Sequence, residues 1–146
     1  MAHKSREREM MGQDLRWVQR LSNLQNAMRN LDSALAIPTP DVVQRAGMVH
    51  FFELCFELSW NTMKDLLEAQ GFGDLKSPRA SIKKAFEIGL IPDGATWLKG
   101  IEDRNLTSHI YNEQVAREVE DMIRNTYAPL FHSLEKSLDS LRNEEK

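Results

Sequence analysis

Apolar residues recur along this chain at the spacing of α-helices, and three breaks rich in proline and glycine separate the helical stretches. The breaks fall at Ala36–Asp41, Gly71–Pro78 and Gly89–Gly94. Before the first break the apolar residues step by three and four positions, which places them on one helical face. They are Trp17, Leu21, Leu24, Met28, Leu31 and Leu35. This pattern predicts an amphipathic first helix.

Polar capping residues mark where the next two helices begin. Asp41 precedes a second helix that we expect to run to the terminating glycine Gly71. Ser77 followed by Pro78 is a typical start for a third, short helix ending at Gly89. The second helix is apolar nearly all round, which is typical of the central helix of a bundle. Its apolar residues include Phe51, Phe52, Leu54, Cys55, Phe56 and Leu58.

Two further helices complete the predicted fold. Asp93 is a suitable cap for a fourth helix, and Asn112 for a fifth, in which Pro129 should produce a kink or end the first half. No alternation typical of strands is visible in the sequence. Because long helices with short links pack as antiparallel neighbours, the sequence predicts an all-α fold, an up-and-down antiparallel helical bundle of about five helices.

The composition narrows the class of protein. The 146 residues suit one domain, with 41% hydrophobic and 28% charged residues. The longest nearly apolar stretch, 51–60, contains two glutamates, so we expect no membrane span. The first eleven residues lack an apolar signal region, and Cys55 is the single cysteine, so we expect a cytoplasmic protein. A net charge of −3 argues against strong non-specific nucleic-acid binding, so any RNA contact should be local.

The segment Asp103–Tyr111, DRNLTSHIY, is unusually dense in hydrogen-bonding side chains. Arg104 carries a permanent charge in a fork that fits phosphate, and His109 can donate and accept protons near neutral pH. The Tyr111 hydroxyl can act as a donor or a nucleophile. The alternative is a purely structural helix end, in which Arg104 pairs with a carboxylate and His109 satisfies a loop carbonyl.

Helix geometry limits how these residues can meet. At about 100° per residue, Tyr111 falls almost above Arg104, whereas His109 lies about 140° away from Arg104. The two can converge only if the helix unwinds near His109 or if two protomers each supply one. The Asn112 cap just beyond favours local unwinding.

Glu53 and Glu57 form a second group of candidates. They stand one turn apart on the apolar second helix, in line with Asn61. Burying a carboxylate requires a partner, and Arg104 is an obvious one. Alternatively, the two glutamates belong to a solvated edge of the second helix.

Other charged groups carry less information. A basic stripe on the third helix could contact phosphates, although a solvated helix face is the simpler interpretation. It consists of Lys76, Arg79, Lys83 and Lys84. His50 and Glu53 have a spacing that metals use, but no second cluster completes a site, so we predict neither a metal site nor a bound cofactor.

Five segments occur in a recognisable order: FELCFELSWNTMKDLLEAQG at 52–71, SPR at 77–79, KKAFEIGLI at 83–91, Trp97 and DRNLTSHIY at 103–111. The most specific part is an arginine followed after four residues by histidine and then, after one more, by tyrosine. Over roughly residues 17–134 the chain thereby resembles a known family, the nucleotidyltransferase substrate-binding proteins of the HEPN superfamily, which are encoded beside a minimal nucleotidyltransferase.

The resemblance implies roles for individual residues. In HEPN ribonucleases, the arginine and histidine of the motif form a metal-independent RNA-cleaving centre between two protomers, here Arg104 and His109. Asn105 matches the polar residue after the arginine. Tyr111 matches the tyrosine to which the partner nucleotidyltransferase attaches AMP, which silences the toxin.

These implications give a functional expectation and an alternative. We expect a homodimeric endoribonuclease, the toxin of a toxin–antitoxin pair, with RNA as substrate and a minimal nucleotidyltransferase as antitoxin. The predicted bundle spans 13–141, between a polar N-terminal extension at 1–12 and a charged tail at 142–146. The alternatives are a non-catalytic substrate-binding or regulatory subunit of a nucleotidyltransferase, or a structural dimerisation module.

Overall fold

The computed structural model describes the backbone of residues 2–144 and the side chains of residues 15–144. Within that part of the chain the fold is helical and contains no strand, as predicted. The helices are α1 (Ala2–Leu35), α2 (Val42–Ala69), α3 (Pro78–Glu87), α4 (Gly94–Leu106), α5 (Glu113–Met122) and α6 (Ala128–Glu144), with a 3-10 turn at Thr107–His109 and a π-turn at Ile123–Tyr127. Because the π-turn joins α5 directly to α6, these two helices form one continuous helical rod, and the described part of the chain has five such rods.

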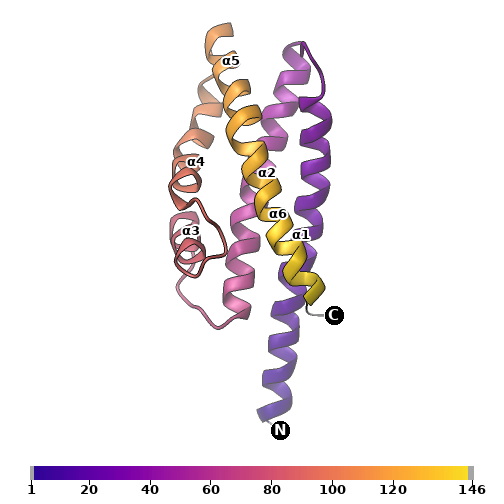
Figure 1. The fold of residues 1–146 in the computed structure, drawn as a ribbon, viewed down its shortest axis with the longest axis vertical. Helices are drawn as coiled ribbons and strands as arrows, with labels where there is room; N and C mark the ends of the chain where they lie inside the picture. Colours follow the sequence, from indigo (N-terminus) through magenta and orange to yellow (C-terminus); the bar gives the residue numbers. More distant parts are fainter. Residues whose placement is uncertain (1, 145–146) are drawn as a thin grey trace.

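The rods pack antiparallel, with α2 in contact with each of the others (Figure 1). The chain rises in α1, descends in α2, crosses through short α3, rises in α4 and returns along α5 and α6. The start of α2 and the turn after α4 therefore lie at the same end of the bundle. The N-terminal part of α1, which includes residues 2–12 of the predicted polar extension, is helical and reaches beyond the other helices in Figure 1.

Each predicted capping residue holds the start of a helix. Asp41 accepts a hydrogen bond from the backbone N–H of Gln44 at 2.7 Å, and the Gln44 side chain accepts from Asp41 N–H at 2.9 Å. This reciprocal pair satisfies two N–H groups that a helix start leaves without partners. Side chains cap α3, α4 and α5 in the same way, through Ser77, Asp93 and Asn112.

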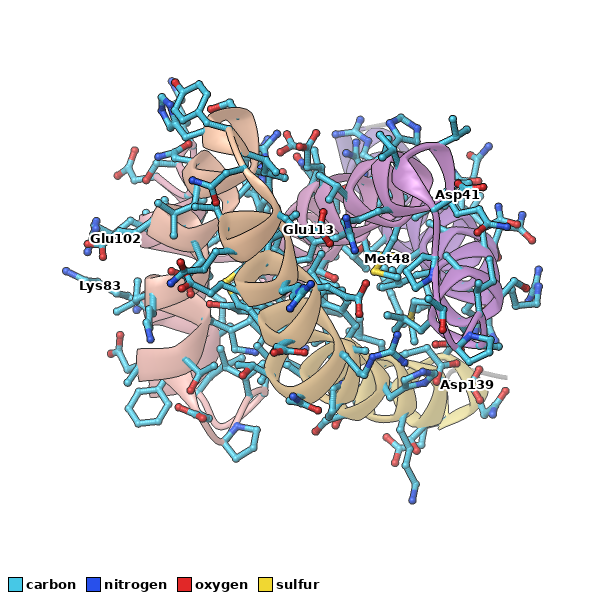
Figure 2. The ribbon with its side chains drawn as sticks, turned by 90° about the horizontal axis from the view of Figure 1, so that it is seen from above. Asp41, Met48, Lys83, Glu102, Glu113 and Asp139 are labelled. Atoms are coloured by element: carbon cyan, nitrogen blue, oxygen red, sulfur yellow. The ribbon has the colours of Figure 1, made fainter. Side chains whose placement is uncertain are left out.

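The core lies around α2 and is rich in aromatic side chains. The largest side chains that are less than 2% exposed include Trp17, Trp97, Tyr127, Phe52, Phe56 and Phe131. Figure 2 shows Met48 directed into the space between the helices, whereas Lys83 and Glu102 point outward. A Cβ atom at Gly100 would lie 2.7 Å from Phe56, so the glycine lets α4 approach α2 closely. This close contact helps to set where the C-terminus of α4 lies along α2.

The interruption expected near Pro129 is the π-turn just before it. The N–H of Ala128 donates to the carbonyl of Ile123 rather than to that of residue 124. Proline lacks an N–H, and its ring clashes with the carbonyl four residues earlier in a regular α-helix. A wider turn ahead of the proline relieves this conflict while the chain continues in nearly the same direction.

Other sequence expectations concern the ends and the surface. Residues 145 and 146 of the predicted tail lie outside the described residues. No helix in the described part is long and apolar enough to cross a membrane. On α3, Lys83 is exposed, and Lys84 pairs with Glu87 of its own helix at 3.0 Å and lies over the Phe72 ring. The basic stripe is therefore a solvated helix face.

Candidate functional site

The polar segment lies where α4 ends and the chain turns into α5. After Leu106 the helix tightens into the 3-10 turn, and Ile110 adopts a non-helical backbone with φ −87° and ψ 89°. The predicted unwinding near His109 is confirmed. Tyr111 consequently lies outside the helix, so its expected position above Arg104 is wrong: the angular rule applies only while the helix continues.

Arg104 pairs with α2, as one of the two interpretations of the acidic residues predicted. Its Nη1 atom lies 3.2 Å from Glu57 Oε2. The indole N–H of Trp60 donates to the same carboxylate at 3.1 Å, and the Asn61 amide donates to the Glu57 carbonyl at 2.8 Å. The indole of Trp60, on the same helix, thus holds the carboxylate while it faces Arg104.

The other predicted carboxylate contacts the turn instead of the arginine. The hydroxyl of Thr107 lies 2.7 Å from Glu53 Oε1 and 2.6 Å from the carbonyl oxygen of Arg104. Its single proton is shared between two acceptors, which ties the last turn of α4 to α2. Glu53 and Glu57 therefore hold the two sides of the same helix end.

His109 and Tyr111 contact each other beyond the helix end. His109 Nδ1 lies 2.9 Å from the Tyr111 hydroxyl, and the two ring centroids are 5.8 Å apart. Both side chains are exposed, Tyr111 to 80%. With Nδ1 engaged by tyrosine, Nε2 is the imidazole nitrogen left to meet a substrate.

A buried hydrogen bond beside the motif was not predicted from the sequence. The Tyr127 hydroxyl, on the π-turn, donates to Asp103 Oδ2 at 2.5 Å. Asp103 is 8% exposed and Tyr127 is fully buried. Burial and the neighbouring carboxylate raise the pKa of Tyr127 far above its usual range. The signal in the sequence was Asp103 itself. It directly precedes Arg104 on the inward side of α4, where a buried carboxylate needs a hydrogen-bond donor from another part of the chain.

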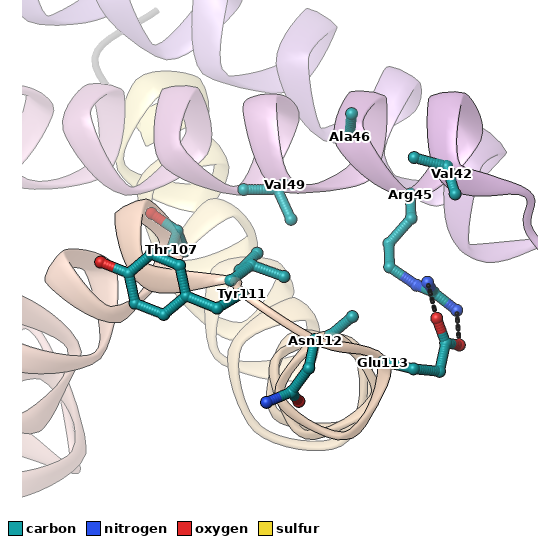
Figure 3. Close-up of a pocket in the computed structure, with 10 residues that line it drawn as sticks. Val42, Arg45, Ala46, Val49, Thr107, Tyr111, Asn112 and Glu113 are labelled. Atoms are coloured by element: carbon teal, nitrogen blue, oxygen red, sulfur yellow. Dashed lines mark hydrogen bonds and ion pairs between the residues drawn. The ribbon is translucent and has the colours of Figure 1, made fainter.

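A pocket of about 470 Å³ adjoins the motif, between the start of α2 and the loop that leads into α5 (Figure 3). Its lining is mostly apolar: Val42, Ala46, Val49, Ile110, Ala116 and the ring of Tyr111, with Arg45, Thr107, Asn112 and Glu113 at its edge. Arg45 Nη2 lies 3.1 Å from Glu113 Oε1, and its Nε atom lies 3.5 Å from Glu120. The hydrogen bonds from Arg45 lower the pKa of Glu113.

The remaining candidate residues lie on the surface. Asn105 is exposed, and its carbonyl accepts a hydrogen bond from the Ser108 hydroxyl at 2.8 Å. His50 is exposed, and its ring lies beside that of Phe51. Among the described side chains, no group of three or more His, Cys, Asp or Glu residues could hold a metal ion.

Comparison with known proteins identifies the family of this chain. The profile of the family described as nucleotidyltransferase substrate binding protein like matches residues 19–140, most of the chain. The chain belongs to this family. The match includes the whole segment from Glu53 to Tyr111, so the resemblance seen in the sequence is confirmed.

Two relatives of this family member are informative. A curated Haemophilus influenzae protein named probable ribonuclease HepT is 33% identical in an alignment of 93 residues that covers 55% of this chain and 60% of that protein. The chain therefore spans less than two thirds of that relative. A crystal structure of a protein from Thermus thermophilus has a TM-score of 0.70 and 30% identity, and the alignment covers 82% of this chain and 98% of that one.

Replacing Glu57 with glutamine should change the free energy of unfolding by less than about 1 kcal/mol. A loss of about 3 kcal/mol would require a deeply buried ion pair. The Arg104 and Glu57 side chains are 40% and 43% exposed, so water compensates for much of the lost pairing. Urea titration of Glu57→Gln and Glu53→Gln measures the change. A loss above about 2 kcal/mol would mean that the ion pair is far less hydrated than its exposure indicates.

Proposed function

We propose that this family member is a metal-independent endoribonuclease of the HEPN type, the toxin of a toxin–antitoxin pair. The observation that carries the proposal is the helix end itself. It presents an arginine, anchored by Glu57, and an exposed histidine whose Nδ1 atom is held by Tyr111. The name of the Haemophilus influenzae relative supports the same reaction class.

The geometry suits RNA cleavage by the RNA's own 2′-hydroxyl. In that reaction a base takes the proton of the 2′-hydroxyl, whose oxygen then attacks phosphorus. The bond from phosphorus to the 5′-oxygen breaks, and an acid protonates the departing 5′-oxygen. Arg104 can stabilise the charge on the non-bridging phosphate oxygens in the transition state. Its side chain is 40% exposed, so a phosphate can approach it without breaking up the core.

The Tyr111 hydroxyl lets His109 serve in either role. In the imidazolium form both ring nitrogens carry protons, so Nδ1–H donates to the tyrosine oxygen and Nε2–H can act as an acid. In the neutral form with its proton on Nδ1, the same hydrogen bond is kept, and Nε2 is unprotonated and can act as a base. The tyrosine oxygen therefore accepts from Nδ1 in both forms, at the same distance.

This division of roles requires two protomers. The motif contains one histidine per chain, whereas the reaction needs a base and an acid. A two-fold dimer that places two copies of His109 at one cleft would supply both. The exposed position of His109 and Tyr111 at one end of the bundle is compatible with such an arrangement.

AMP attached to Tyr111 would silence this site. The phenolic oxygen would attack the α-phosphorus of ATP, with pyrophosphate leaving, and would become an ester oxygen without a proton. That ester oxygen would be a weaker acceptor for the Nδ1–H of His109, and the new phosphate would be attached at this oxygen, 2.9 Å from Nδ1. Inhibition would therefore act first on the histidine, and not through the direct pairing with Arg104 that an unbroken helix implies.

Mass spectrometry after incubation with the partner nucleotidyltransferase and ATP should show added AMP on wild-type protein and none on Tyr111→Phe. The chain has two tyrosines, and Tyr127 is fully buried, so Tyr111 alone offers an accessible phenol. Tyr127→Phe is the matched control and should be modified like wild type. Added mass on Tyr111→Phe would show that another residue is the acceptor.

The family description also supports a second candidate function, a non-catalytic substrate-binding or regulatory subunit of a nucleotidyltransferase. Its specific support is that Arg104 is already neutralised by Glu57 in the isolated chain. Cleavage of RNA in EDTA by wild type, compared with His109→Ala, separates the two functions. If wild type never cuts RNA yet accepts AMP on Tyr111, the subunit is the better account.

A further inference from the structure

We propose that the pocket beside Tyr111 binds one unpaired nucleobase of the RNA, next to the phosphate that is cut. This inference rests on the proposed ribonuclease function and adds a substrate subsite to it. It starts from the fact that Tyr111 belongs to two structures at once: its hydroxyl contacts His109, while its ring forms one wall of the pocket. In Figure 3 the hydroxyl points away from the Arg45–Glu113 pair, and the ring lies at the opposite end of the pocket from that pair.

The size and lining of the pocket suit a flat aromatic ligand. Pockets of about 300 Å³ or more hold small molecules, so 470 Å³ accommodates a nucleobase and part of its ribose. Single-stranded RNA is bound by splaying out bases and stacking them on aromatic side chains. The Tyr111 ring, 80% exposed at the mouth of the pocket, offers such a surface. Val49 projects from α2 toward the loop and provides an apolar wall (Figure 3).

The polar groups at the edge favour a base over a phosphate. Unlike Arg104, which has one carboxylate partner and is 40% exposed, Arg45 is held by both Glu113 and Glu120 and is 15% exposed, so it is not available to neutralise a phosphate. The Glu113 carboxylate retains acceptor capacity and is 57% exposed. A carboxylate can accept from the exocyclic amino group of a base, as acidic side chains do with cytosine. We therefore expect adenine, cytosine or guanine to bind better than uracil.

The position of the pocket indicates which part of the RNA would contact which part of the site. The phosphate would lie at Arg104 and His109, and the neighbouring base would turn past the Tyr111 ring toward α2. Binding of this base would also fix the Tyr111 ring and, through its hydroxyl, the orientation of the His109 imidazole. Binding of the base in the pocket would thereby favour the His109 orientation that proton transfer requires.

The test fills the pocket and removes the base in the same experiment. Ala46 is exposed and lines the pocket, so Ala46→Trp should fill it without disturbing the core. Val43→Trp is the matched control, because Val43 is 80% exposed on the same helix and does not line the pocket. The probes are short oligonucleotides with 2′-O-methyl groups, which cannot be cut, each intact or with one abasic position. Binding is measured by fluorescence anisotropy in the full-length protein.

We expect one abasic position to weaken binding to wild type and to Val43→Trp about tenfold, the size of one stacked base. Ala46→Trp should bind the intact probe about tenfold more weakly, with no further loss at that position. If the losses from Ala46→Trp and from the abasic position add, or if no abasic position weakens binding to wild type, the proposed subsite is wrong. A change in dimerisation of Ala46→Trp without this coupling would instead assign the pocket to an interface between copies. Cleavage of an unmodified RNA, measured in parallel, shows separately whether the ribonuclease proposal fails.

Discussion

Replacing His109 with alanine should lower the rate of RNA cleavage about 10²- to 10⁴-fold, the contribution of a well-placed proton-transfer group. The fold should be unaffected, because His109 is exposed and its one hydrogen bond joins it to Tyr111, which is exposed as well. Arg104→Ala should also lose cleavage with the fold preserved. Initial rates on a defined RNA in EDTA measure the loss, and circular dichroism checks the fold.

The matched control is His50→Ala, which removes an exposed imidazole from α2. It should cleave like wild type. Tyr111→Phe should lose at most about tenfold in rate, far less than His109→Ala, since it removes one neutral hydrogen bond. Equal cleavage by wild type and His109→Ala would exclude the proposed acid–base role, whatever the fold of the variant.

Tyr127→Phe should lower the free energy of unfolding by about 2–3 kcal/mol near neutral pH. The substitution removes the hydrogen bond to Asp103 and leaves that buried carboxylate without the hydroxyl. Tyr111→Phe is the matched control: the same atom is removed from an exposed ring, and the change should stay within about 0.5 kcal/mol. Urea titrations of the three proteins measure these differences. Equal stability of Tyr127→Phe and wild type would mean that the carboxylate finds another donor.

The same bond predicts how stability depends on alkaline pH. The folded pKa of Tyr127 is raised, so its stabilising effect is fully present below the unfolded pKa of about 10. As the pH rises above that value, the unfolded chain loses the phenolic proton while the folded chain keeps it, and stability falls. This group contributes about 1.4 kcal/mol per pH unit. The gap between wild type and Tyr127→Phe should therefore narrow above about pH 10 in the same titrations.

The fold was predictable because its signals are local. Asp41, Ser77, Asp93 and Asn112 each cap a helix through a backbone N–H three residues ahead, and that spacing is visible in the sequence. The motif residues were also visible, since Arg104 and His109 combine side chains that a helical core does not need. The pairing of Arg104 with Glu57 was one of two interpretations of the acidic residues, and it rested on the cost of a lone charge on an apolar helix.

The rest of the site depended on geometry between distant segments. Nothing near Asp103 in the sequence names Tyr127 as its donor, because the contact requires the packing of α4 against the π-turn. The position of Tyr111 was wrong because an ideal helix was extended past Leu106, where the chain changes to a tighter turn. The pocket was not foreseen either, since its walls come from α2, the loop and α5.

The π-turn makes the orientation of the site depend on the exact number of residues between α5 and α6. The buried residues through this stretch, Val119, Ile123, Tyr127 and Phe131, are spaced by four three times in succession. This spacing covers one position more than the buried face of a regular α-helix would use. Deleting a single residue here would rotate α5 by about 100° relative to α6. The Asn112 cap and the loop that presents His109 would turn with it. We therefore expect a one-residue gap or insertion in this stretch to keep the motif but to turn it away from the position that it has in this chain.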